Sequence, residues 1–572
     1  MSTQGFGVPA SADAGPRPGL LKRIFHYWFP SAEECFTRGL WFKFKGYAVL
    51  AIVVLLVLGG VFAGPRAYAR LSCGQFSLTS NIWRDGGECV GISGGSYTFG
   101  HPAMSTVAAA NADTNCPADS RSQVITIGAL VTLGDLNSGA RADHELEGFA
   151  AGVWQANRES GDLSSKCQYR VRLLIAQMGA NEQAAVDDAR ALAGSGVVAV
   201  VGMGLSSQQS ADAATVLNAD KIPMVADVIT GEGFDQDGSR ADGADFSDCQ
   251  SDSSLPGVDS YWQQDWQFFF RVSYRALTQV NDALSYMRTL PRSDSYYVVQ
   301  PTQTNDPYTC STLPLIINGL TNDGITNDPV KIDFDTAASQ ATQDSAAGAI
   351  CLTKGAVTVF YTARDVYLGS FLADIIEDKD NGECTPSQIT VLSQSDAAQL
   401  RIPSLFNEAS RQEVLTSSLL DGPNAWMRIY YTPLADPSLI GTGGKPLPPG
   451  YTDLITAFAA LGIPQQDLVD GWAIMAYDAV ATVATALANS PPGMSTPEIT
   501  GSYIQSQIQD LMSSASAHPA PGADGPIRFD RYGNRIGPGP GVVRLCPLTP
   551  GTSAPPRTVQ PSPGKPGTCP TP

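Results

Sequence analysis

The stretch VVGMGLSSQQSADAA, residues 200–214, joins the end of an apolar run to a segment whose composition predicts a helix. Gly202 and Gly204 permit a tight turn between them, because glycine adopts backbone conformations that other residues avoid. Ser206 and Ser207 stand where the helix should begin, a position that favours serine as a cap. Because the stretch contains no Lys, His or Cys, it does not itself indicate a catalytic centre.

The sequence around this stretch alternates apolar runs with amphipathic ones. The runs are VITIGAL, DHELEGFAAGVWQANRE, YRVRLLIAQ, NEQAAVDDARALAGSG, VVAVVGM and IPMVAD. Continuous apolar strands separated by helices predict a parallel sheet covered on both faces. A second series follows, with SYYVVQ, LPLIINGL, VKIDFD, AVTVFY, DVYLGSFLADIIED and QITVLS. The sequence therefore predicts an α/β fold with two doubly wound, Rossmann-like lobes.

The position of the two serines favours an anion as their partner. In an open parallel sheet, ligands bind beyond the carboxyl ends of the strands, beside helix N-termini. Unpaired backbone N–H groups and the helix dipole make such an end attractive to anions, and a hydroxyl there can donate to a carboxylate. A helix cap without any ligand explains the same residues, and the local sequence leaves both interpretations open.

Composition argues against several classes of function. The chain has 572 residues, which is more than one ordinary domain. Its net charge of −19 argues against nucleic-acid binding, because a nucleic-acid-binding surface needs clustered Lys and Arg. There is no G-x-S-x-G elbow around the serines, no phosphate-binding Gly-Lys-Ser/Thr and no CxxC pair, and the chain has four His. We therefore predict no enzyme, no catalytic residues, no cofactor, no metal site and no nucleic-acid partner. The acidic segment 231–266 is expected to be a solvated surface loop.

An apolar segment near the N-terminus predicts a membrane anchor. Residues 46–64, GYAVLAIVVLLVLGGVFAG, carry no charge and are long enough to cross a bilayer as a helix. Basic residues precede this segment, which places the N-terminus in the cytoplasm and the main domain outside. A cleaved signal peptide is the alternative, with AYA at 67–69 as its cleavage site. The polar region ahead of the apolar segment is too long for that alternative, so we expect a retained single-pass signal anchor.

The cysteines agree with an extracytoplasmic domain. Cys35 precedes the anchor, and ten cysteines follow it, an even number in a compartment that permits disulfides. The simplest pairing joins neighbours in order, although sequence alone does not fix it. The ten cysteines are Cys73, Cys89, Cys116, Cys167, Cys249, Cys310, Cys351, Cys384, Cys546 and Cys569.

These features divide the chain into five regions. We expect a cytoplasmic segment at 1–45, the anchor at 46–64 and a cysteine-containing stalk with little regular structure at 65–118. The two-lobed domain should cover 119–545, with lobe 1 at about 119–265 and 405–500 and lobe 2 at about 266–404 and 501–545. The Pro-rich segment 546–572 should be an extended, poorly packed tail.

Segments spread over roughly 122–545 resemble one family. They are ITIGALVTLGD, VVGMGLSSQQSADAA, IPMVADVIT, FFFRVSYRALTQVNDAL, AYDAVATVATAL and GPIRFDRYGNR, in that order. Together they are similar to type I periplasmic-binding proteins, in particular the branched-chain amino-acid (Leu/Ile/Val) type of ABC-transporter substrate-binding protein. The resemblance implies two lobes joined by a hinge, with a small-molecule ligand held in the cleft between them.

The resemblance also implies ligand-binding residues. Ser206 and Ser207 match the serines that receive the ligand's carboxylate, and Val228 and Thr230 match the loop that completes this pocket. Arg364 falls where the family often has an aromatic residue, and Asp396 where it has an acid for the ligand's amine. Arg364 as a surface residue and Asp396 as a helix cap are the alternatives.

The function implied is binding without reaction. A membrane-anchored extracytoplasmic protein would capture a small polar, amino-acid-like ligand for an ABC permease. The alternative is a ligand-sensing receptor or interaction module of the same fold, with a membrane signalling partner and no role in transport. A lipidated delivery protein would have neither a permanent membrane anchor nor a disulfide-rich stalk. The presence of both favours this alternative.

Overall fold

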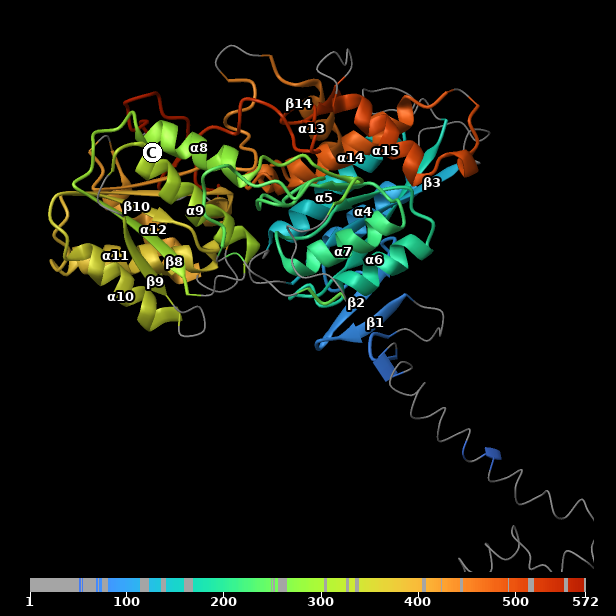
Figure 1. Cartoon of the computed structure of the whole chain (residues 1–572), viewed down its shortest axis with the longest axis horizontal. Helices are drawn as coiled ribbons and strands as arrows, with labels where there is room; N and C mark the ends of the chain where they lie inside the picture. Colours follow the sequence, from blue (N-terminus) through green and yellow to red (C-terminus); the bar gives the residue numbers. More distant parts are fainter. Residues whose placement is uncertain are drawn as a thin grey trace, which may run out of the picture. The chain divides into compact units, whose positions relative to one another are not determined.

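The computed structural model describes residues 51, 52, 54, 68, 69 and 71–74, and then 81–569 apart from 114–122, 135–139, 159–167, 248, 250–252, 256–264, 303–305, 326–328, 335–338, 404–407, 423, 443–445, 492, 513–518 and 550–553. The chain divides into two compact units, Met1–Trp83 and Arg84–Pro572. The second unit contains both predicted lobes, and each lobe is built on one sheet (Figure 1).

Lobe 1 is a sheet with helices on both faces. Its strands have the order β1-β2-β4-β3-β5-β6-β7, and the pairs from β4 through β7 are parallel, as the apolar runs predict. The strands are β1 (Ile82–Asp85), β2 (Glu88–Ser93), β3 (Val124–Val131), β4 (Arg170–Gln177), β5 (Val200–Gly202), β6 (Met224–Ala226) and β7 (Phe269–Arg271). The helices are α4 (Ala103–Ala112), α5 (Arg141–Ala156), α6 (Ala185–Gly194), α7 (Gln208–Ala219), α13 (Pro449–Leu461), α14 (Trp472–Ala488) and α15 (Gly501–Gln509).

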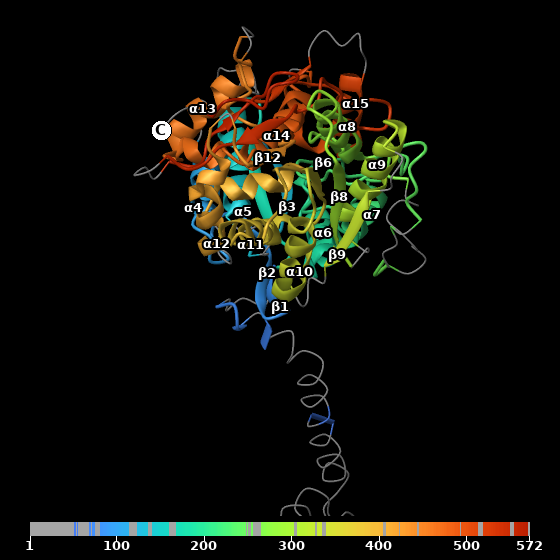
Figure 2. The same ribbon diagram turned by 90° about the vertical axis from the view of Figure 1, so that its left-hand side faces the viewer.

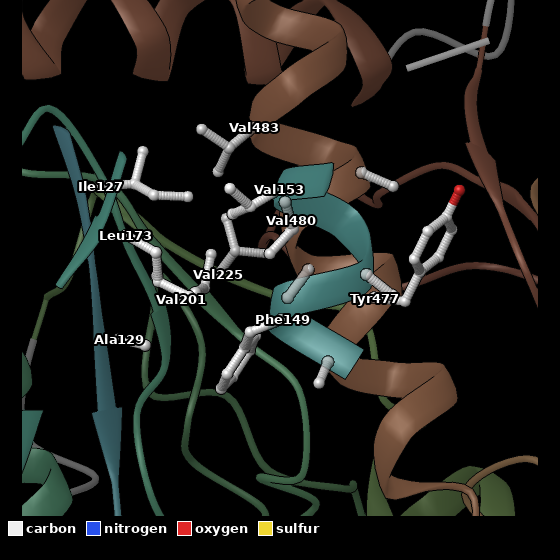
Figure 3. Close-up of a cluster of buried hydrophobic side chains, with 14 of the residues drawn as sticks. Ile127, Ala129, Phe149, Val153, Leu173, Val201, Val225, Tyr477, Val480 and Val483 are labelled. Carbon is white, nitrogen blue, oxygen red and sulfur yellow. The ribbon is translucent and has the colours of Figure 1, made fainter. Parts of the chain in front are cut away.

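The core of lobe 1 joins segments that are far apart in the sequence. Figure 3 shows Val480 and Val483 of α14 beside Val153 of α5, next to strand residues such as Val201. Two glycines of α5 allow this close approach, because a Cβ at Gly148 would lie 2.2 Å from the Ala473 carbonyl oxygen. A Cβ at Gly152 would similarly lie 2.7 Å from Cβ of Val480. Close packing of α5 on α14 therefore returns the C-terminal part of the chain to lobe 1.

Lobe 2 repeats this design on a second sheet. Its order is β16-β15-β12-β11-β10-β8-β9, with parallel pairing from β12 to β9 and antiparallel pairing of β15 with β12 and β16. The strands are β8 (Ser295–Pro301), β9 (Val330–Phe334), β10 (Ala356–Tyr361), β11 (Gln388–Ser393), β12 (Met427–Tyr431), β15 (Val543–Leu545) and β16 (Thr558–Val559). The helices are α8 (Ala276–Met287), α9 (Pro307–Asn322), α10 (Ser339–Cys351), α11 (Leu368–Asp380) and α12 (Glu408–Thr416). Figure 2 shows the same elements from the side.

Short elements complete the described part of the chain. The hairpin β13 (Ala520–Gly522) and β14 (Gly525–Ile527) packs against α14. Short 3-10 helices are η4 (Asp365–Tyr367), η5 (Ser395–Arg401), η6 (Ser418–Leu420), η7 (Gln465–Leu468), η8 (Thr496–Glu498) and η9 (Asp510–Met512). Between the described elements, three connections pass from one lobe to the other: 272–275, 432–448 and 528–542. We call these the crossing connections.

The lobe boundaries differ from those we expected. β7 belongs to the first sheet, although we placed 266–404 in lobe 2, and β12 belongs to the second sheet, although we placed 405–500 in lobe 1. The hairpin β13–β14 packs in lobe 1 rather than in lobe 2. The apolar runs predict strands correctly but do not say which sheet a strand joins, since pairing partners lie far away in the sequence.

Two terminal regions pack more closely than we expected. The expected stalk contains β2, which pairs with β4, and α4, which buries Met104 and Val107 against the lobe 1 core. The Pro-rich tail is also packed: β16 pairs with β15, and Tyr430 donates a hydrogen bond to the Pro566 carbonyl oxygen. Proline disfavours a helix in this tail but is tolerated in an edge strand such as β16. A Pro-rich sequence therefore predicted the lack of helix but not the close packing of the tail.

The acidic segment after β6 is irregular where it is described; most of its described residues from Asp237 to Ser247 are at least partly exposed, as expected, but residues 231–235 are buried. Glu232, Phe234 and Asp235 are fully buried. Their partners lie elsewhere in the chain: Arg275 forms an ion pair with Glu232, and the Asn534 amide donates to Asp235. Charge in a sequence segment predicts exposure only when no buried cation or donor can satisfy it.

The disulfides follow the simplest pairing where they are described. Cys249 pairs with Cys310, Cys351 with Cys384, and Cys546 with Cys569. Cys73 and Cys89 are also disulfide-bonded, while Cys116 and Cys167 lie outside the described residues. Most of the predicted anchor also lies outside them, and none of the described helices has the length and apolar character needed to cross a membrane.

Candidate ligand site between the lobes

A left-handed turn positions the two serines. Gly202, Met203 and Gly204 all have positive φ, of 86°, 77° and 69°, so the chain turns sharply as soon as β5 ends. Gly204 cannot be replaced easily, because a Cβ there would lie 2.5 Å from Oε1 of Glu182. Glu182 is buried and accepts hydrogen bonds from the Leu205 backbone N–H, at 2.7 Å, and from the Thr132 hydroxyl, at 2.8 Å. This carboxylate therefore holds the turn in place.

The two serines have different roles in the structure. Ser207 is the N-cap of α7: its Oγ accepts from the Ser210 backbone N–H, and its hydroxyl donates to Glu182. Ser206 is buried, and its Oγ accepts from the backbone N–H groups of Thr230 and Gly231, both at 3.1 Å. Since a hydroxyl has two acceptor lone pairs and one proton, these bonds orient the Ser206 O–H as a donor.

The loop after β6 completes this side of the site. The Thr230 Oγ1 is buried and has no hydrogen-bond partner among the described residues. The backbone N–H of Val228 donates to the Asp227 carboxylate at 2.8 Å, so this N–H is already satisfied. Thr230 thus supplies a buried hydroxyl without a partner among the described residues, and Ser206 an O–H able to donate, whereas Ser207 and Val228 stabilise the loops that carry them.

Lobe 2 faces these hydroxyls with charged side chains. Arg364, just after β10, donates to both carboxylate oxygens of Asp306, at 3.1 and 2.8 Å. Its guanidinium lies over the Tyr308 ring, with Cζ 4.6 Å from the centroid. It also reaches lobe 1 and donates to the Ser206 carbonyl oxygen at 3.0 Å. Burial alone would lower the pKa of Arg364, but Asp306 and Asp396 outweigh it and raise that pKa.

Asp396 links the two lobes a second time. Its Oδ1 lies 3.3 Å from Nη1 of Arg141, at the start of α5 in lobe 1, and its Oδ2 lies 4.0 Å from Nη1 of Arg364. Oδ2 is buried and has no hydrogen-bond partner among the described residues. The predicted residues Ser206, Thr230, Arg364 and Asp396 therefore lie close together, connected through one guanidinium. With Arg141, they form what we call the interlobe site.

Three of the supporting residues were not predicted from the sequence. Asp306 caps α9 ahead of Pro307, and the Asp-Pro pair before an apolar run is a recognisable helix start. Glu182 and Arg141 gave no such signal. Glu182 adopts a left-handed φ of 54° although it is not glycine, and Arg141 is almost fully buried although arginine is usually exposed.

Buried carboxyl groups lie directly behind the lobe 1 loops. Glu145 of α5 and Asp227 are fully buried and share a hydrogen bond. Burial raises the pKa of Asp227 to about 7, against the opposing effect of its hydrogen bonds to Glu145 and to the backbone. Burial and the nearby Asp227 charge raise the pKa of Glu145 well above its usual value. Two like charges this close cannot both ionise readily, so the pair retains a proton near neutral pH.

His144 of α5 is paired with carboxylates. Its Nδ1 lies 2.6 Å from Oδ2 of Asp470, and its Nε2 lies 3.6 Å from Oδ1 of Asp467. Burial lowers the pKa of His144, but the Asp470 and Asp467 carboxylates raise it to about 9 overall. The imidazolium is therefore charged at neutral pH and acts as an ion-pair partner.

No family model matches the chain, and no curated protein matches it in sequence. Among solved structures, a substrate-binding protein of an ABC transporter from Aeropyrum pernix matches with a TM-score of 0.50 and 11% identity, over 77% of this chain and 95% of that one. The chain has the type I periplasmic-binding fold.

Two further structures match at lower scores. The leucine-binding protein LivK from Thermotoga maritima has a TM-score of 0.49 and 15% identity, over 76% of this chain and 99% of that chain. A substrate-binding protein from Desulfitobacterium hafniense in complex with Leu has a TM-score of 0.47 and 17% identity, over 76% of this chain and 100% of that chain. The match with a TM-score of 0.50, at 11% identity, bears on the fold alone, and the ligand must be argued from the interlobe site itself.

Proposed function

We propose that the chain captures a small zwitterionic, amino-acid-like ligand at the interlobe site. The observation that carries this is a pair of buried atoms without a hydrogen-bond partner among the described residues, Thr230 Oγ1 and Asp396 Oδ2, beside the Ser206 hydroxyl, whose two accepted bonds leave its O–H able to donate. Buried polar atoms without partners are costly, which favours a ligand that supplies those partners. A carboxylate would accept from the two hydroxyls, and an ammonium group would donate to Asp396.

Closure of the lobes is the mechanism we infer. Ser206 and Thr230 belong to lobe 1 and Asp396 to lobe 2, so the complete set of contacts exists only when the lobes are together. A ligand that makes all of them shifts the population toward the closed arrangement. Binding occurs without reaction, and an ABC permease would recognise the closed form.

We further propose that this domain lies outside the cytoplasm, held by the segment 46–64 as a single-pass anchor. Disulfides support the location, since they persist in oxidising compartments. One observation favours the alternative of a sensing or interaction module. Arg364 bonds directly to the Ser206 carbonyl oxygen, so the lobes already contact each other through their own side chains.

Thermal-shift screening of the full-length protein against the common amino acids distinguishes these functions. We expect at least one amino acid to raise the melting temperature of the wild type, because binding to the folded state stabilises it. The same compound should have a weaker effect on Asp396→Asn. If no amino acid raises the melting temperature, the capture proposal fails and the interaction module becomes the better account.

A further inference from the structure

A cavity lies where the crossing connections run side by side. It has a volume of about 910 Å³, within the range of small-molecule sites, and we call it the hinge groove. Tyr274 from the first connection, Leu447 from the second and Ile536 from the third line it, together with the hairpin β13–β14. No residue of the interlobe site is among the residues that line it.

The apolar part of the hinge groove is partly open to solvent. Leu447 is 54% exposed and Ile536 is 42% exposed, whereas most large aliphatic side chains among the described residues are less exposed. Prolines such as Pro448 and Pro538 form much of the remaining wall, and their fixed φ angles make that wall rigid. A preformed apolar surface of this kind can bind a ligand with little ordering cost.

Among the described residues that line the hinge groove, carboxylates outnumber basic side chains. Asp436 is neutralised by Arg401, at 2.8 Å, and Arg535 is held by Asp478, at 3.1 Å. Asp524 lies 3.7 Å from the same Arg535. Asp282 accepts a hydrogen bond from the Gly541 backbone N–H at 2.9 Å, and no ion pair forms with it among the described residues.

These two carboxylates are also partly desolvated. Burial raises the pKa of Asp282, against the opposing effect of the Gly541 N–H. Burial raises the pKa of Asp524 to about 6, although Arg535 opposes it. Both groups would therefore gain from a cation placed in the groove, since an opposite charge nearby stabilises the ionised carboxylate.

We propose that the hinge groove binds a small organic cation with an apolar body, and that this site is separate from the interlobe site. The apolar body would pack on Leu447 and Ile536, and the ammonium group would be held by the negative charge of Asp282 and Asp524. Asp282 belongs to α8 of lobe 2, whereas Asp524 belongs to the hairpin that packs in lobe 1. An occupant therefore contacts both lobes and biases their relative position.

Ligand-observed NMR titration with three matched probes tests this site on the full-length protein. The probes are 4-phenylbutylamine, the uncharged 4-phenylbutan-1-ol and the acidic 4-phenylbutyrate. We expect the amine to bind, the alcohol to bind about tenfold more weakly and the acid to bind weakest, because only the amine complements the carboxylates. Absence of amine binding, or equal binding of amine and alcohol, overturns the proposal.

Amino-acid substitutions in and outside the hinge groove test where on the protein the amine binds. Asp282→Asn keeps an oxygen that can accept from Gly541, and Leu447→Ser changes an exposed side chain, so both should fold. Each should weaken amine binding at least threefold. The controls are Asp187→Asn on α6 and Leu352→Ser, which is 78% exposed and outside the groove; both should leave binding unchanged. Equal effects of groove and control variants would show that the amine binds elsewhere, which refutes the proposal.

Discussion

The two sides of the interlobe site are built from different chemistry. The lobe 1 side presents hydroxyl groups on two tight loops, which are held by hydrogen bonds to the buried carboxyl groups of Glu182 and Asp227. The lobe 2 side presents charged side chains, with Arg364 fixed by Asp306 and by the Tyr308 ring. The first side depends on backbone geometry and the second on ion pairs. Substitutions should therefore affect ligand binding, pH dependence and stability differently on the two sides.

The largest effect is expected on the charged side. Asp396→Asn removes the negative charge that we assign to the ligand's ammonium group and replaces the carboxylate whose Oδ1 lies 3.3 Å from Nη1 of Arg141. Any amino acid identified by the thermal screen should bind about 2 kcal/mol more weakly, roughly thirtyfold in Kd. Isothermal titration calorimetry measures this change. An unchanged Kd would remove Asp396 from the binding site.

The hydroxyl side should show a smaller effect that separates two adjacent serines. Ser206→Ala removes the O–H donor and leaves the Thr230 and Gly231 N–H groups without their acceptor, so ligand affinity should fall by about 1.5 kcal/mol. Ser207→Ala removes a helix cap and should lower the free energy of unfolding by about 1 kcal/mol while leaving affinity unchanged.

Calorimetry and urea denaturation of both serine variants provide the comparison. The opposite pattern, with affinity lost in Ser207→Ala and retained in Ser206→Ala, would show that the wrong serine has been assigned to the ligand.

The carboxyl groups behind the lobe 1 loops predict a pH-dependent difference. The pKa of Asp227 is raised to about 7 in the folded state, so its ionisation lowers the free energy of unfolding as pH rises from about 4 through 7. Asp227→Asn abolishes this loss and should stabilise the protein by about 1 kcal/mol at pH 8, with little effect at pH 4. Urea denaturation at both pH values, with Asp187→Asn as a control, measures it. If the free energies of unfolding of Asp227→Asn and the wild type differ by the same amount at pH 4 and pH 8, the raised pKa that we attribute to burial of Asp227 is contradicted.

The smallest effect is expected from a change that keeps charge but not shape. Arg364→Lys retains the cation but loses the two-oxygen contact with Asp306, and should lower the free energy of unfolding by about 0.5 kcal/mol. Arg288→Lys is the matched control, because Arg288 makes a similar contact with Asp323 at a more exposed position and should change stability less. Equal losses in both variants would mean that burial of the Arg364 pair contributes nothing.

The sequence predicted the fold better than the surroundings of the site. Apolar runs and their order predicted two parallel sheets, and the strand end at 202 predicted Ser206 and Ser207 at a helix start. Thr230, Arg364 and Asp396 were implied by the family resemblance, and they lie close to Ser206 in the structure. The division of strands between the lobes could not be read from the runs, since β12 and β7 join sheets through distant partners. Sequence motifs describe local turns, whereas sheet membership is set by long-range pairing.

Buried charge was the other feature that sequence patterns missed. Arg141 and Glu182 have ordinary neighbours in the sequence, and their burial depends on partners that lie elsewhere in the chain, Asp396 and the Ser207 hydroxyl. The acidic sequence of the segment after β6 likewise led us to expect exposure at Glu232, which is buried because Arg275 pairs with it. A charged residue can be placed inside a protein only when its partner is known, and that partner is found in three dimensions.

The central claim, that one lobe receives the carboxylate and the other the amine of the same ligand, is tested most directly by chemical modification of that ligand. Calorimetry would compare the amino acid found in the screen with its methyl ester and its N-acetyl derivative, on the wild type, Ser206→Ala and Asp396→Asn. We predict that the methyl ester binds the wild type more weakly than the parent amino acid does, and that this difference is much smaller on Ser206→Ala. We predict the same for the N-acetyl derivative: it binds the wild type more weakly than the parent, and the difference is much smaller on Asp396→Asn. An ester that binds the wild type as tightly as the parent amino acid would contradict the account.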